Sequence, residues 1–170
     1  AGVSAPAAAE PFEVVHQVGG LVEAFAADGD QLYLGIGSRL LILDADTPSG
    51  VPEGGSRYVR LPRTITDAAV LRAGVVAVLA ADVVYFVDVA DPEGPSITST
   101  YEHGTSLHAI ESWGDLVILH GEKALFVIDA SDPLSAEHVG TLSLPDEYDR
   151  RSKVLAGDGV VFVSHYASNV

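Results

Sequence analysis

Four side chains able to do chemistry recur at one position of a repeat that runs through the chain. They are Glu23, Asp67, His108 and Ser152, which lie ten residues before Tyr33, Ala77, Ile118 and Phe162, respectively. Equivalent positions of successive repeats are expected to lie near one another in the fold. Two carboxylates and an imidazole placed together in this way can bind a cation or transfer protons. The same groups also cap strand ends or contact solvent in a channel. The spacing therefore leaves ligand binding, catalysis and a structural role open.

The remaining motifs favour binding over catalysis. None of the six histidines forms the His-x-x-x-His or His-Glu-x-x-His spacing of zinc sites, and the chain has no cysteine. It also contains no Gly-x-Ser-x-Gly nucleophile turn and no phosphate-binding loop. We therefore predict no cofactor, no metal and no catalytic residue. If Glu23 and Asp67 did hold a cation, their carboxylates would favour Ca²⁺.

A strand motif that ends in aspartate recurs in the chain and identifies the strands of the repeat that carries Glu23, Asp67 and His108. It occurs as Leu40–Asp44, Val84–Asp88 and Leu125–Asp129, and a proline follows each aspartate four residues later, at Pro48, Pro92 and Pro133. The spacings between successive aspartates are 44 and 41 residues. We predict that Asp44, Asp88 and Asp129 accept backbone hydrogen bonds in turns, and that the prolines end the strands because they cannot donate to a ladder.

Each copy is predicted to form four strands. In the first copy we expect them at 21–27, 31–36, 39–45 and 57–61, with Asp28-Gly29-Asp30 as a tight hairpin turn. The third strand is apolar on both faces, which indicates burial on both sides. Stacked four-stranded sheets with a period of about 42 residues are typical of β-propeller blades.

We accordingly predict an all-β propeller of about three and a half antiparallel blades, an incomplete ring. The expected blades span 13–61, 62–103 and 104–145, with a half-blade at 146–170. Glu13–Val18 is expected to form an outer strand without a blade of its own. Residues 1–12 are rich in Ala and Pro and fit an interdomain linker or a mature N-terminus.

Two segments of the third copy, Gly114–Leu119 and Ala124–Pro133, resemble the LVIVD-repeat propellers. The resemblance covers roughly residues 13–165 and is weaker in the first copy, where Thr47-Pro48 replaces Asp-Pro. It implies a propeller that is secreted or displayed on the surface of a bacterium or archaeon. This family brings no catalytic motif to carry over.

Charge and hydropathy narrow the range of partners. The 24 acidic and 9 basic residues give a formal net charge of -15, which argues against a nucleic-acid surface. No apolar run approaches the roughly 18 residues of a membrane span. We expect apolar faces at both ends of the arc, covered by the remaining blades of a longer chain or by self-association.

The sequence thus predicts a non-enzymatic extracellular or cell-surface module that acts as an interaction scaffold for a protein or glycan. The alternative is a propeller enzyme or cation-binding module with a channel-mouth site at Glu23, Asp67 and His108.

Overall fold

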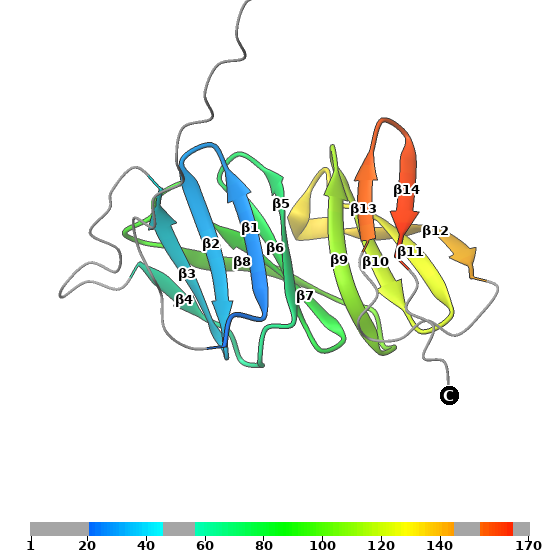
Figure 1. The fold of residues 1–170 in the computed structure, drawn as a ribbon, viewed down its shortest axis with the longest axis horizontal. Coiled ribbons are helices and arrows are strands. Elements are labelled where there is room, and N and C mark those ends of the chain that lie inside the picture. Colours follow the sequence, from blue (N-terminus) through cyan, green and yellow to red (C-terminus); the bar gives the residue numbers. More distant parts are fainter. Residues whose placement is uncertain (1–20, 46–56, 145–153, 165–170) are drawn as a thin grey trace, which may run out of the picture.

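The chain folds as three four-stranded antiparallel sheets followed by a two-stranded sheet (Figure 1). The structure is a computed structural model that describes residues 21–45, 57–144 and 154–164. In each four-stranded sheet the strands lie in chain order, as in a propeller blade. The strands are β1 (Ala24–Asp28), β2 (Gln31–Ile36), β3 (Arg39–Asp44) and β4 (Tyr58–Arg60) in blade 1; β5 (Asp67–Arg72), β6 (Val75–Ala80), β7 (Val83–Asp88) and β8 (Ser96–Glu102) in blade 2; β9 (Leu107–Trp113), β10 (Leu116–Gly121), β11 (Ala124–Asp129) and β12 (Glu137–Ser143) in blade 3; and β13 (Val154–Gly157) and β14 (Val160–Val163) in the half-blade.

The predicted fold class, an incomplete propeller ring, is confirmed. The strands also lie close to their expected places. In blade 1 the first strand begins at Ala24 rather than at residue 21, and the other three match to within one residue at each end. A short 3₁₀ helix, η1 (Pro133–Ser135), interrupts blade 3. Within the described residues, no helix is long and apolar enough to cross a membrane.

Several predicted features fall on residues that the structure does not describe. Ser152, Pro48, the linker at 1–12 and the outer strand at Glu13–Val18 all lie outside the described ranges. The exact blade boundaries and the extent of the half-blade therefore remain predictions.

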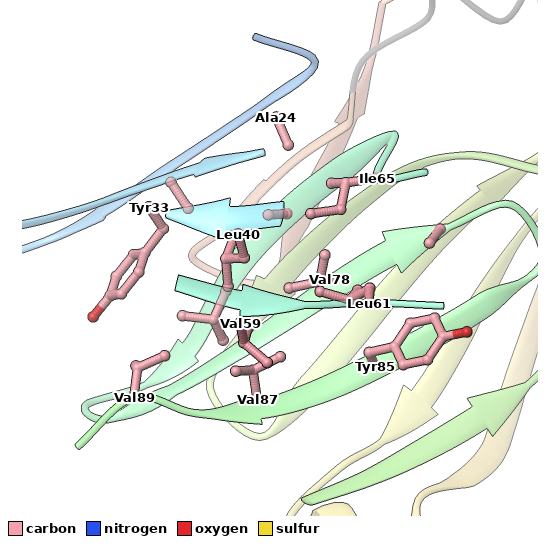
Figure 2. Close-up of a cluster of buried hydrophobic side chains, with 14 of the residues drawn as sticks. Ala24, Tyr33, Leu40, Val59, Leu61, Ile65, Val78, Tyr85, Val87 and Val89 are labelled. Carbon is pink, nitrogen blue, oxygen red and sulfur yellow. The ribbon is translucent and has the colours of Figure 1, made fainter. Parts of the chain in front are cut away.

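Apolar clusters between neighbouring blades hold the arc together. The first strands β1, β5, β9 and β13 follow one another side by side, and each blade packs its faces on the next (Figure 1). Figure 2 shows the cluster between blades 1 and 2, where Leu40 and Val59 meet Val78, Tyr85 and Val87. A second cluster joins blades 2 and 3, and a third joins blade 3 to the half-blade.

Blade 2 shows why the third strand of the repeat is apolar on both faces. Residues Val83 to Val87 of β7 are all buried, with Phe86 and Val87 fully inaccessible. Blades 1 and 3 cover the two faces of this strand, so neither face is left for polar side chains. In β3 and β11 the burial is less complete, because each belongs to a blade nearer the end of the arc.

The turn aspartates act as the sequence predicts where the structure describes them. Asp88 Oδ1 accepts a hydrogen bond from Ala90 N at 2.9 Å, and Asp129 Oδ1 accepts one from Ser131 N at 2.9 Å. Hydrogen bonds from the backbone N–H and the hydroxyl of Ser131 hold the pKa of the Asp129 carboxyl below its usual value. For Asp44 the equivalent donor would be residue 46, outside the described ranges.

Candidate functional site

The predicted site residues sit where the first strand of each blade begins. Glu23 lies just before β1 and is exposed, Asp67 is the first residue of β5, and His108 is the second residue of β9. The turn between the second and third strands of a blade returns to the same end, as the pairing of Asp67 with Leu79 shows. The fold therefore gathers groups from three blades at the same end of the strands, where the first strand of each blade begins.

A pocket of about 570 Å³ opens at this end. We call it the blade-end pocket. Glu23 from blade 1 and His108 from blade 3 both line it, with residues of blade 2 between them. The full lining is Glu23, Thr66, Ala81, Asp82, Gly104, Thr105, Ser106, Leu107 and His108. Two of the four predicted site residues are thus brought to one cavity.

Asp67 lies beside the pocket but is directed elsewhere. Its side chain is 8% exposed, and its Oδ2 accepts a hydrogen bond from Ile110 N at 3.2 Å. Because Ile110 belongs to β9 of the next blade, this carboxylate links blades 2 and 3. Burial raises the pKa of the nearby Glu111, the hydrogen bond from Ser112 opposes that rise, and the charge of Asp67 adds to it.

His108 has a buried histidine beside it that the sequence analysis did not single out. The rings of His108 and His120 lie 6.0 Å apart between centroids, at an angle of 67°. His120 is fully inaccessible, and burial together with the charge of His108 lowers the pKa of His120 to about 4. His120 is therefore neutral at pH 7. The signal for its burial was its place in β10, where it follows three buried apolar residues.

The polar groups of the pocket suit hydrogen bonding to a ligand. Thr66 donates from its hydroxyl to the Leu79 carbonyl at 3.2 Å, and Asp82 forms an ion pair with Arg63. This ion pair offsets the negative charge of Asp82 and leaves Glu23 as the exposed acidic side chain of the lining. Among the described residues, no group of three His, Asp or Glu side chains is placed to hold a metal ion.

A second histidine pair, His103 and His138, lies between blades 2 and 3. The ring centroid of His103 is 4.0 Å from that of Phe126 and 5.9 Å from that of His138. Burial and the neighbouring His138 lower the pKa of His103. His138 Nε2 is 2.8 Å from the Gly140 carbonyl. This cluster packs between outer parts of the two blades, and no repeat spacing in the sequence pointed to it.

The comparisons with known proteins bear on the fold alone. No protein-family model matches the chain, and no curated protein matches it. The β-propeller domain of Cps50 (Swd1) from Myceliophteria thermophila is 15% identical over 85% of this chain and 48% of that one, with a TM-score of 0.64. The fold is that of a β-propeller.

Two further solved structures give the same result. A protein of unknown function from Desulfotomaculum acetoxidans superposes with a TM-score of 0.71 at 9% identity, over 88% of this chain and 50% of that one. BamB from Moraxella catarrhalis superposes with a TM-score of 0.63 at 15% identity, over 86% and 44%. The chain thus spans about half the length of these three matched chains.

Proposed function

We propose that this chain is part of a non-enzymatic β-propeller interaction module that binds a partner protein at the blade-end pocket. The observation that carries the proposal is the pocket itself, which takes its lining from three successive blades. Packed strands hold this lining in place, while the loops and turns that supply Thr105, Ser106 and Asp82 are free to vary with the partner. Backbone, hydroxyl and carboxylate groups there offer hydrogen bonds to a peptide.

Binding is favoured over catalysis because ionisable groups near the pocket already take part in contacts within the protein. The Asp67 carboxylate accepts the Ile110 N–H of the next blade, and His120 is neutral and enclosed. A channel-mouth enzyme or cation site on Glu23, Asp67 and His108 would need all three side chains directed at one ligand. The pocket lining includes Glu23 and His108 but takes Thr66 in place of Asp67.

A peptide-display selection against the purified chain, run in parallel with a glycan array, tests the proposal. We expect selected peptides to bind, and Glu23→Gln or Ser106→Ala to weaken them about tenfold, which corresponds to about 1.4 kcal/mol. Asp30→Asn is the matched control, because it also removes one exposed carboxylate but lies in the β1–β2 turn at the other end of blade 1. Equal binding by the pocket variants would contradict the proposal, and binding to the array alone would assign the pocket to a glycan.

We further propose that the module belongs to the LVIVD-repeat propellers and lies outside the cell or on the surface of a bacterium or archaeon. The motif at Gly114–Leu119 and Ala124–Pro133 supports membership, and the net charge of -15 suits a well-solvated surface. Protease treatment of intact cells that produce the full protein tests the location. We expect digestion without lysis, and protection until the cells are lysed would refute this location.

A further inference from the structure

A second, smaller pocket adjoins the blade-end pocket. Its volume is about 240 Å³, and Thr105 and Ser106 line both cavities. These two residues lie in the connection between β8 and β9, where blade 2 leads into blade 3, and we call them the shared wall. The rest of the described lining comes from blade 3, at Glu122, Lys123, Ala124 and Phe126. A ligand that crosses the shared wall therefore contacts both cavities.

The ring of Phe126 gives the smaller pocket a fixed apolar surface. Its centroid lies 4.0 Å from that of His103, which follows β8 of blade 2. Gly121 leaves room for the ring, because an added Cβ there would lie 2.9 Å from Phe126 Cε2 and 3.4 Å from the Ser106 carbonyl oxygen. The two charged residues of the described lining have opposite signs. The smaller pocket therefore suits an apolar side chain.

The blade-end pocket offers negative charge instead. Glu23 is exposed there, and Asp82 accepts a hydrogen bond from Arg63 through Oδ1. None of the described residues of the lining is Lys or Arg. The formal net charge of -15 for the whole chain adds to the negative potential, and the walls of a cavity concentrate that potential. A cationic group is therefore attracted to this pocket.

Hydrogen bonding favours the same kind of ligand. An ionised carboxylate such as that of Glu23 only accepts hydrogen bonds, whereas an ammonium or guanidinium group only donates them. The hydroxyls of Thr105 and Ser106, which are exposed residues, can accept as well. An acidic side chain would place a like charge beside Glu23, and an apolar one would remove water from the carboxylate without replacing its hydrogen bonds. A lysine or arginine side chain avoids both costs.

We infer that the partner segment is a peptide with a basic and an apolar residue close together in its sequence. The arginine or lysine side chain enters the blade-end pocket and pairs with Glu23, and the apolar side chain packs on Phe126 across the shared wall. This inference rests on the proposed function, since it specifies what the interaction module binds. The charge pair sets the choice of partner, and burial of the apolar side chain adds affinity that does not depend on the pairing.

Peptides from the display selection test the inference, first through their sequences and then through one substitution. We expect them to be enriched in Arg or Lys with an apolar residue nearby. In a synthetic peptide that carries arginine at the basic position, citrulline keeps the shape of the side chain and removes its charge. We expect this change to weaken binding about tenfold, and by less as the salt concentration rises. Selected peptides without a basic residue, or a citrulline peptide that binds equally well, would overturn the inference.

A double-mutant cycle identifies the group that the basic residue contacts. In Glu23→Gln, the citrulline change should weaken binding about twofold at most, because the carboxylate that it pairs with is gone. Asp30→Asn is the matched control, since it removes an exposed carboxylate at the other end of blade 1 and should keep the whole citrulline effect. A citrulline effect of equal size in the parent chain and in Glu23→Gln would refute the placement of the basic residue against Glu23.

Thiol labelling locates the peptide without altering buried residues. The chain has no cysteine, so Ser106→Cys and Lys123→Cys place a single thiol on the shared wall and in the smaller pocket, respectively. Peptide at ten times its dissociation constant should slow the labelling of both thiols about tenfold. Glycine in place of the apolar residue of the peptide should restore the labelling of Lys123→Cys alone. Ser96→Cys is the control and should label equally with and without peptide, because Ser96 is exposed and pairs with Asp88 at the other end of blade 2.

The labelling result also separates this inference from the proposed function. Ser106→Cys that stays unprotected by a bound peptide would refute binding at the blade-end pocket, and the inference would fail with it. Protection of Ser106→Cys by a peptide that binds equally well with citrulline would leave the proposed function standing and refute the basic residue. Protection of Lys123→Cys by the glycine-substituted peptide would refute the apolar contact with the smaller pocket.

Discussion

The buried histidine beside the blade-end pocket makes stability depend on pH in a defined direction. His120 is fully inaccessible in β10, and burial, with a smaller effect of the His108 charge, lowers the pKa of His120 from 6.5 to about 4. In the unfolded chain the same imidazole takes up a proton near pH 6.5. As the pH falls below 6.5, protons therefore bind to the unfolded chain before they bind to the folded one, and the free energy of unfolding decreases.

The size of the effect follows from the two pKa values. Each pKa unit corresponds to 1.36 kcal/mol, so the gap between 6.5 and about 4 gives a loss of about 3 kcal/mol at strongly acid pH. At pH 5 the folded imidazole is still mostly neutral, and the loss relative to pH 7.5 is about 2 kcal/mol. The stabilisation is complete above pH 6.5 and is lost as the pH falls towards 4.

Urea unfolding at pH 7.5 and pH 5 measures this difference. We expect the parent chain to lose about 2 kcal/mol more between these conditions than a His120→Gln variant, which has no imidazole at this position. Comparing the two chains removes contributions that they share, including that of Glu111, whose raised pKa acts in the opposite direction. His138→Gln is the control, because His138 is exposed and its loss should leave the His120 effect in place. Equal pH dependence in the parent and His120→Gln would show that burial of His120 does not set its protonation.

Three further predictions concern packing and turns. An added Cβ at Gly35 would lie 2.7 Å from Ile65 Cγ2, so Gly35→Ala should lower the free energy of unfolding in urea by about 1–3 kcal/mol. The control is Gly140→Ala, which should lower it much less because the nearest atom to its added Cβ is at an ordinary 3.7 Å. Equal decreases in the two variants would contradict the close contact between Gly35 and Ile65. Phe86 is fully buried between blades, so Phe86→Ala should cost about 3–5 kcal/mol and Phe86→Leu clearly less, unless the blades close over the cavity. Asp129→Ala removes the acceptor of its turn and should lower the melting temperature, whereas Asp129→Asn keeps an acceptor and should lower it less; an unchanged midpoint in Asp129→Ala would show that the turn needs no side-chain acceptor.

The blade pattern could be predicted closely because its determinants are local. In every described blade, the turn between the first two strands contains a glycine with positive φ, and this places the hairpin directly. These glycines are Gly29, Gly74, Gly114 and Gly159. The aspartate that ends a third strand bonds to the backbone two residues further on, which is again a short-range interaction. Turn chemistry and strand alternation therefore sufficed to predict the elements and their order.

The candidate site could be predicted only in part, because contacts between blades select the direction of each side chain. Glu23 and His108 reach one pocket, as their equivalent repeat positions suggested. Asp67 occupies the same repeat position but turns its carboxylate to the Ile110 N–H of the next blade. The repeat spacing assigns Glu23, Asp67 and His108 to the same position of the blade. It does not show which hydrogen-bond donor of the next blade lies near each side chain.

The sequence by itself therefore determined the repeat, the four strands of each blade and the apolar third strand, since hydrophobic alternation and turn residues act over a few positions. Only the tertiary structure decided which groups share a cavity and which are enclosed. His120 lies in a strand readable from the sequence, yet its neutral state depends on burial and on His108 in the adjacent strand of the same blade. Phe162 likewise matches Tyr33 in the repeat, but Tyr33 is buried by the next blade and Phe162 is exposed, because burial depends on what lies across the face.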